Sequence, residues 1–146
     1  MGARVTLETR GLDELANESR ERLLGFNQER AGPFSDVRVV LTARGARGEL
    51  VGGLVGLGFW NGLFIELLWV DEAVRGQGIG TSLMRGAETE ARKRGWEVCF
   101  LSTWTFQAPG FYPRLGYEPF GELKGMPPGH SRTWFAKWLT SRRAEE

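Results

Sequence analysis

The most constraining feature of the sequence is a turn with three glycines, RGQGIG, at residues 75–80. Before it lies an apolar stretch, residues 63–70, with the composition of a strand, and after it the apolar residues recur with helical spacing. Glycines let the backbone turn sharply, and the first amides of a helix leave their N–H groups unpaired. The pattern predicts a strand, an anion-binding turn and a helix, with Arg75 adding a positive charge. A plain strand–helix connection remains the alternative.

Two common phosphate-binding motifs fit this turn poorly. A P-loop needs a lysine and then serine or threonine after its last glycine, whereas Thr81 and Ser82 follow Gly80 directly. A dinucleotide fingerprint would need glycine at position 81 and a place after the first strand of a parallel repeat. The turn satisfies neither condition, so the identity of the anion depends on other features.

The remaining pattern predicts a mixed α/β fold around this turn. We expect strands over residues 5–9, 37–41, 50–60, 63–70, 96–103, 117–123 and 132–139. We expect helices over residues 13–26, 78–94 and 108–115, with Asp13 as the first N-cap and a loop over residues 27–33. Asn61-Gly62 favours a type I′ hairpin. The strand–helix–strand run over residues 63–103 predicts a crossover unit with two parallel strands.

The helix after the turn has two distinct faces. Its expected apolar face consists of Ile79, Leu83, Met84, Ala87 and Ala91. Its expected solvent face consists of Arg85, Glu88, Arg92 and Lys93. This separation is typical of a helix that packs on a sheet.

The composition is that of an ordinary globular domain and excludes several functions. We expect one domain over residues 1–140 and a frayed tail over residues 141–146. With 19 basic and 18 acidic residues, no charge excess favours nucleic acid or a membrane surface. We expect no secretory signal and no membrane span. Cys99 is the only cysteine and His130 the only histidine, which excludes an intrachain disulfide and a structural zinc site and favours the cytoplasm.

Two segments resemble signatures of the GNAT acetyltransferase superfamily. Residues 75–80, after Leu68 and Val70, resemble its R/Q-x-x-G-x-G/A signature after the fourth strand. Residues 107–117, QAPGFYPRLGY, are similar to its N-x-x-A-x-x-F-Y-x-x-x-G-F segment. The order of the elements agrees over nearly the whole chain. The resemblance implies a mixed, mostly antiparallel sheet of about seven strands flanked by helices, with a parallel strand–helix–strand unit that binds coenzyme A.

The resemblance also implies an acyltransferase that moves an acetyl group from acetyl-CoA directly to a primary amine of an unidentified small molecule or peptide. We expect no metal ligands, and a homodimer is the family-level expectation. The positions that match the family's cofactor contacts are Leu68, Trp69, Val70, Arg75, Gly76, Gln77, Gly78, Ile79, Gly80, Thr81 and Gln107. Gln107 departs from the family's asparagine, which leaves its contact open between the pantetheine arm and a helix start. The backbone of residues 68–70 would pair with the pantetheine amides like an added strand.

Glu66 and Tyr112 are the candidate catalytic residues. Glu66 lies in an apolar strand and matches an acidic position of the family; by alternation it would share a face with Phe64, Leu68 and Val70. A carboxylate among apolar neighbours would suit a base, although a structural glutamate at this place is the alternative. Tyr112 matches the family tyrosine that faces the CoA sulfur and can donate a proton to it.

Several other residues have more than one interpretation. His130, in a loop, could orient the substrate or act as another base, but a lone loop histidine is more often a bystander. Cys99 is expected in the core, as is Tyr117 with its hydroxyl satisfied by backbone. Tryptophans 60, 69, 104 and 134 could line the acceptor pocket or pack elsewhere. For the whole chain, a CoA-binding sensor without turnover is the alternative to the enzyme.

Overall fold

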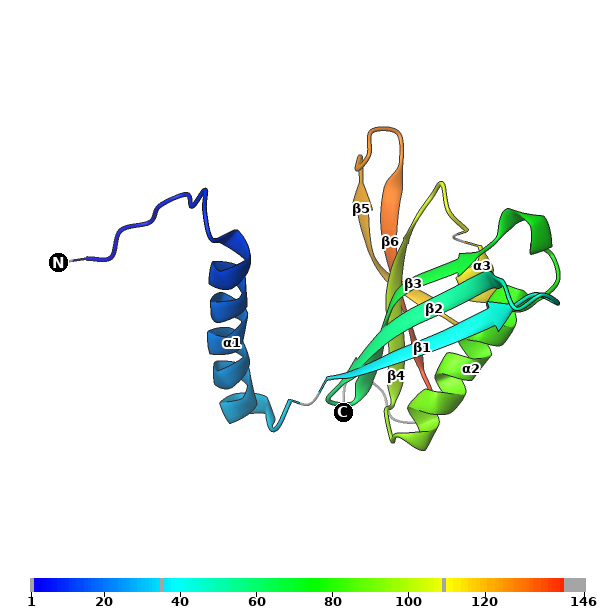
Figure 1. The fold of residues 1–146 in the computed structure, drawn as a ribbon, viewed down its shortest axis with the longest axis horizontal. Coiled ribbons are helices and arrows are strands. Elements are labelled where there is room, and N and C mark those ends of the chain that lie inside the picture. Colours follow the sequence, from blue (N-terminus) through cyan, green and yellow to red (C-terminus); the bar gives the residue numbers. More distant parts are fainter. Residues whose placement is uncertain (1, 35, 109, 141–146) are drawn as a thin grey trace. The chain divides into compact units, whose positions relative to one another are not determined.

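The computed structural model of the chain describes residues 2–34, 36–108 and 110–140 (Figure 1). The chain divides into two compact units, Met1–Phe34 and Ser35–Glu146. The expectation of a single domain over residues 1–140 stays a prediction. The tail expected over residues 141–146 lies outside the described residues.

The first unit contains one helix, α1 (Leu12–Ala31), within its described residues. The helix begins after Gly11 in a left-handed conformation, so the expected N-cap at Asp13 is wrong, and Asp13 instead lies in the first turn, where an acidic side chain is favourable. Residues 27–31 continue the helix rather than forming a loop, because no glycine or proline interrupts them before Gly32. Residues 5–9 form no strand, since alternation alone supplies no partner strand.

The second unit is a mixed α/β fold of sheet and helices. Its elements are β1 (Val37–Arg44), β2 (Leu50–Phe59), β3 (Gly62–Val70), the 3₁₀ turn η1 (Glu72–Val74), α2 (Ile79–Lys93), β4 (Val98–Trp104), α3 (Phe111–Arg114), β5 (Glu118–Lys124) and β6 (Ser131–Trp138). The strands form one sheet in the order β1-β2-β3-β4-β6-β5. Only β3 and β4 are parallel, so the predicted crossover through α2 is confirmed. The described residues give six sheet strands instead of about seven, since residues 5–9 do not join.

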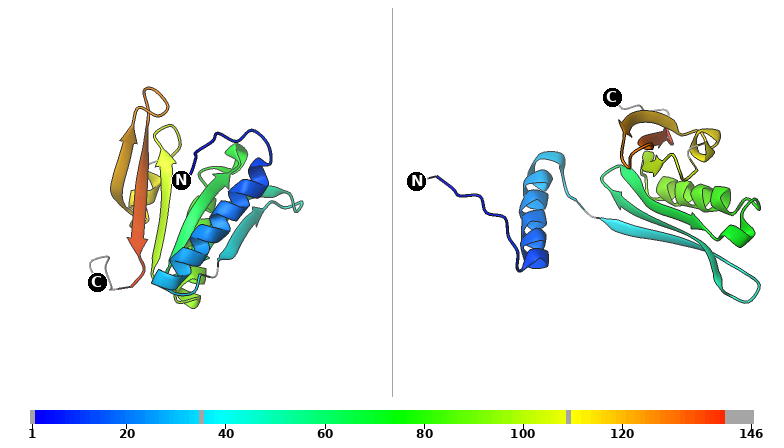
Figure 2. Two further views of the ribbon diagram at one scale, coloured as in Figure 1. Left: turned by 90° about the vertical axis from the view of Figure 1, so that its left-hand side faces the viewer. Right: turned by 90° about the horizontal axis from the view of Figure 1, so that it is seen from above.

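Helix α2 covers one face of the sheet, as two further views show (Figure 2). Its expected apolar face is confirmed: four of the five side chains are buried, and Ile79 packs partly buried against the core. Two glycines of β2 leave room for side chains that pack on this face of the sheet. A Cβ at Gly52 would lie 3.1 Å from Ile79, and one at Gly58 would overlap the ring of Trp96.

Glu88 contradicts the expected polar face of α2. Only 2% of its surface is exposed, although the sequence places it among the charged residues of that helix. Its carboxylate accepts hydrogen bonds from the hydroxyl of Tyr117 and the ammonium of Lys137. Helix α2 is therefore buried on the side that faces the sheet and also around Glu88. The spacing of apolar residues does not predict this second buried region, because the buried side chain is charged.

The hairpin between β2 and β3 is confirmed, but one residue earlier than expected. Phe59 pairs with Gly62, so the two loop residues are Trp60, with φ 48°, and Asn61. Gly62 belongs to the strand because a Cβ there would lie 3.3 Å from the ring of Phe100 on β4. Packing between neighbouring strands thus overrides the preference of Asn-Gly for the turn positions.

Candidate functional site

Strands β3 and β4 run side by side only at their beginnings. Their pairing is confined to Gly62 with Val98, Leu63 with Cys99 and Phe64 with Phe100. Beyond Phe64 the strands separate, so residues 65–70 of β3 have no partner on the β4 side. The predicted cofactor residues Leu68, Trp69 and Val70 lie on this open edge, where an extended chain could add backbone hydrogen bonds.

The glycine turn lies at the end of the open edge. Gly76 and Gly78 have φ of 84° and 79°, a left-handed conformation that glycine adopts without strain, and Gln77 is exposed between them. Gly78 is the N-cap of α2 and provides no side-chain cap, and the first turn, which includes Thr81, has no acidic residue. The guanidinium Nε of Arg75 donates to the Val70 carbonyl at 3.3 Å. Uncapped amides beside an arginine side chain are suited to a phosphate.

The turn also contacts the segment that carries Tyr112. A Cβ at Gly80 would lie 3.3 Å from the ring of Phe111, the residue before Tyr112. Tyr112 is 9% exposed, and its ring packs edge-on against Phe111 and Tyr117. Burial raises the pKa of the Tyr112 phenol, which keeps it protonated at neutral pH. The close contact at Gly80 therefore holds the glycine turn and the candidate acid in one packed unit.

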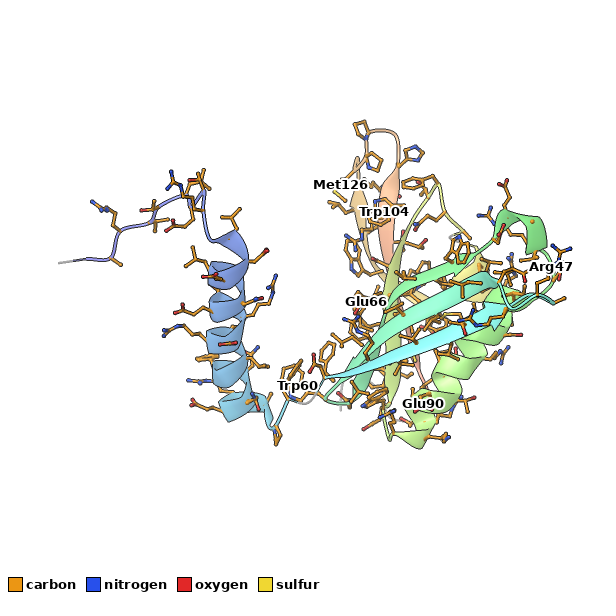
Figure 3. All side chains as sticks on the ribbon, in the orientation of Figure 1. Arg47, Trp60, Glu66, Glu90, Trp104 and Met126 are labelled. Atoms are coloured by element: carbon orange, nitrogen blue, oxygen red, sulfur yellow. The ribbon has the colours of Figure 1, made fainter. Side chains whose placement is uncertain are left out.

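Glu66 does not lie where alternation placed it. Val55 of β2 pairs with Leu67 and Gly56 pairs with Ile65, which leaves Glu66 as the extra residue of a β-bulge. The bulge shifts the alternation by one, so Leu68 and Val70 pack against the core while Glu66 is exposed. The expectation that Glu66 shares a face with Leu68 and Val70 and lies among apolar neighbours is wrong. Figure 3 labels Glu66 on β3 beside the region where the strands separate.

Gln107 and His130 lie at the end of β4. The Gln107 side-chain oxygen accepts from Thr103 Oγ1 at 2.9 Å and from the Trp104 amide at 3.0 Å, so it closes the turn after β4. His130 is exposed; its Nδ1 lies 3.2 Å from Thr105 Oγ1 and its ring packs edge-on against Phe106. Gln107 is thus held within its own turn, whereas His130 connects the loop between β5 and β6 to the segment after β4.

Two further groups, Tyr117 and Arg132, have partners that the sequence did not reveal, whereas Cys99 lies where it was expected. The Tyr117 hydroxyl is satisfied by the Glu88 carboxylate at 2.9 Å rather than by backbone. Cys99 is fully buried in the core, as expected, and burial raises the pKa of its thiol from 9.0 to about 12. A thiol with so high a pKa stays protonated at neutral pH, and a protonated thiol is a poor nucleophile. The guanidinium of Arg132 lies over the rings of both Trp104 and Trp134.

The described part of the chain contains neither a candidate metal cluster nor a candidate membrane span. Residues 2–34, 36–108 and 110–140 contain no group of three or more histidine, cysteine, aspartate or glutamate side chains that could hold a metal ion. No helix within the same residues has the length and apolar character needed to cross a membrane. The cytoplasmic location stays a prediction.

Residues 36–119 match the family model described as an acetyltransferase (GNAT) domain. Blasticidin-S acetyltransferase of Streptomyces morookaense is 49% identical, over 76% of this chain and 91% of that protein. Acetyltransferase Atu2258 of Agrobacterium fabrum is 37% identical, over 81% of this chain and 86% of that protein. The crystal structure of an acetyltransferase from Bacillus cereus superposes with a TM-score of 0.83 at 30% identity, over 94% of this chain and 98% of that one.

Proposed function

The chain belongs to the GNAT family of acetyltransferases, and we propose that it moves an acetyl group from acetyl-CoA directly to a primary amine, with Glu66 as base and Tyr112 as acid. Family membership makes the chain an acyltransferase and acetyl-CoA its co-substrate. The observation that carries the proposal is the separation of β3 from β4, with the glycine turn at its end.

The open edge of β3 and the turn suit opposite ends of one elongated ligand. The edge of β3 over residues 65–70, which no longer pairs with β4, matches the amides of a pantetheine arm, and the uncapped α2 terminus with Arg75 matches a pyrophosphate. Backbone amides on such an edge also stabilise the negative charge that develops on a thioester oxygen during attack. The thioester would then lie between the separated strands, within reach of both sheet faces.

Glu66 suits the role of base because of the bulge. The extra residue interrupts the ladder at the position where the strands separate, and the exposed carboxylate is accessible to a polar acceptor. A primary amine is protonated at neutral pH and must lose a proton before it attacks. Glu66 takes that proton, directly or through water. The amine nitrogen then bonds to the acetyl carbon as the carbon–sulfur bond breaks, and the second proton that the nitrogen loses passes to the departing thiolate through water.

Tyr112 suits the role of donor to the leaving sulfur. No hydrogen bond of its hydroxyl to another described residue is found, so the donor is available. Because burial raises the phenol pKa, full proton transfer to a thiolate with a pKa of about 8.5 is uphill. The principal contribution of Tyr112 is therefore a hydrogen bond to the sulfur as charge develops there.

The first acceptor to test is blasticidin S, because the 49% identical relative carries that name. We expect the purified chain and acetyl-CoA to release free thiol and to add one acetyl group to blasticidin S, detected by mass spectrometry. A panel of other primary amines, run in parallel, identifies a different acceptor. Tight acetyl-CoA binding without thiol release on any amine would favour a sensor over an enzyme.

A matched pair of variants tests the base. Glu66→Gln should lower kcat by about 100-fold or more, because general-base catalysis contributes that much at one step. Glu90→Gln is the control, since Glu90 lies on α2, where it pairs with Arg94 at 2.7 Å. Equal activity of the two variants would remove Glu66 from the mechanism while leaving acetyl transfer itself intact.

A further inference from the structure

Arg132 is held between two tryptophans on the sheet face that α2 does not cover. Its guanidinium carbon lies 4.5 Å from the ring centre of Trp104 and 4.9 Å from that of Trp134. Its Nε donates to Ser102 Oγ at 2.8 Å. Each cation–π contact stabilises the guanidinium position, and the serine bond sets its rotation. The side chain is thus fixed by contacts on β4 and β6 together.

The register places this cluster on the same face as the open side of the site. Trp104 pairs with Arg132 and Ser102 pairs with Trp134, whereas their neighbours Leu101, Thr103 and Phe135 are buried toward α2. Leu67, which pairs with Val55, is exposed on the face away from α2 and follows Glu66 directly. Figure 3 labels Glu66, which lies on β3, and Trp104, which lies on β4. These are the two strands that separate at the site.

Among the described residues, the guanidinium has no carboxylate partner. None of the ion pairs among the described residues includes Arg132, although the side chain is only partly exposed. Glu122, on the neighbouring strand, pairs with Thr133 and so faces the other side of the sheet. Glu118 is on the Arg132 face but pairs with Ala136, four residues away, about 13 Å along the strand.

The groups that the cluster presents are donors. Among the described residues, Nε of Arg132 donates a hydrogen bond to Ser102, and the two terminal guanidinium nitrogens remain as donors for a ligand. The indole Nε1 of Trp104 is a further buried donor with no acceptor in that part of the chain. A carboxylate offers only acceptors, and its planar geometry matches a fixed guanidinium fork better than it matches a flexible lysine.

We propose that Arg132, held between Trp104 and Trp134, binds a carboxylate of the acceptor, so that the acceptor is an amine that also carries an acid group. This subsite rests on the proposed acetyl transfer. The amine end of the acceptor faces Glu66 and the acid end faces Arg132. A fork already immobilised by two aromatic rings loses little freedom on binding, which is why the cluster favours recognition over a merely structural stack.

The test compares two probes that differ only in charge, 4-(aminomethyl)benzoate and 4-(aminomethyl)benzamide. Their binding to the full chain in the presence of CoA is followed by tryptophan fluorescence, and their acetylation by thiol release. We expect the benzoate to bind roughly 10- to 100-fold more tightly than the benzamide, the usual gain from a charge-assisted hydrogen bond. Raising the salt concentration should reduce that preference.

Two variants at one position complete the test. Arg132→Gln should abolish the preference for the benzoate, and Arg132→Lys should keep part of it, while both keep their affinity for acetyl-CoA. The absence of a preference in the unmodified chain, or its survival in Arg132→Gln, would overturn the subsite. Loss of acetyl-CoA affinity in both variants would also count against it, since the residue would then be structural. A benzoate preference without thiol release on any amine would leave the subsite standing and reject acetyl transfer.

Discussion

The hydroxyl of Tyr117 donates a hydrogen bond of 2.9 Å to Oε2 of Glu88, and both residues are buried. Lys137 completes the contact by donating to Oε1 of Glu88 at 2.9 Å and to the carbonyl of Leu115 at 2.8 Å. The network joins α2, which begins at the glycine turn, to β6 and to the residue after α3. It therefore connects the two segments that would hold acetyl-CoA and the candidate acid.

Removal of the lysine should destabilise the fold strongly. Lys137→Met leaves the Glu88 carboxylate buried without its cation, and we expect a loss of about 3–5 kcal/mol in the free energy of unfolding. Urea denaturation measures it. The double variant Glu88→Met with Lys137→Met removes both charges and should recover most of the loss. Equal destabilisation of the single and double variants would show that packing, not the uncompensated charge, accounts for the effect.

Stability should fall at high pH through Cys99. Burial, with a smaller contribution from the Glu88 charge, raises the pKa of the folded thiol to about 12 from 9.0. The unfolded chain then loses its proton first, so the free energy of unfolding declines as the pH rises from about 9 towards 12. One such group contributes about 1.4 kcal/mol per pH unit at most.

The matched variant isolates that contribution. Burial also raises the pKa values of the Tyr112 and Tyr117 phenols, so their ionisation in the unfolded chain lowers stability as the pH rises, as the Cys99 thiol does. Cys99→Ala should reduce the slope of stability against pH by up to one proton, measured by urea denaturation between pH 7 and about pH 11. An unchanged slope would mean that the thiol does not titrate differently in the two states.

Tyr112→Phe should lower turnover while leaving cofactor affinity nearly unchanged. The phenylalanine keeps the ring contacts with Phe111 and Tyr117 and removes only the hydroxyl, which is the proposed donor to the leaving sulfur. We expect kcat to fall by roughly 10- to 1,000-fold. Steady-state kinetics give kcat, and calorimetric titration gives the affinity for acetyl-CoA. Full activity in this variant would reject the assignment of the acid.

Gly78→Glu should abolish acetyl-CoA binding by placing a negative charge at the uncapped start of α2. Gly78→Gln is the matched control, because it has the same size and the same backbone strain at φ 79° without the charge. The space around a Cβ at this glycine is open, so neither variant clashes with the described residues. Titration with acetyl-CoA should show a larger loss for the glutamate. Identical losses would argue against an anion at this turn.

Some of the site was predictable because its requirements are local. The left-handed glycines of the turn, the apolar face of α2 and the parallel placement of β3 and β4 depend on backbone conformation and periodicity. These properties depend on a few neighbouring residues, so the pattern of residue types along the chain predicts them. The roles assigned to Glu66 and Tyr112 stay predictions, since they depend on the ligands that the site binds.

The sequence by itself determined the mixed α/β class, the GNAT assignment and the place of the glycine turn between β3 and α2. Only the tertiary structure decided the direction of Glu66, the burial of Glu88 and the placement of Arg132 between two rings. A single bulge reverses which side chains face the core, and periodicity cannot report it. A buried charge depends on its partner, and Lys137 lies 49 residues from Glu88. Contacts of that kind exist only after the sheet has brought distant strands together.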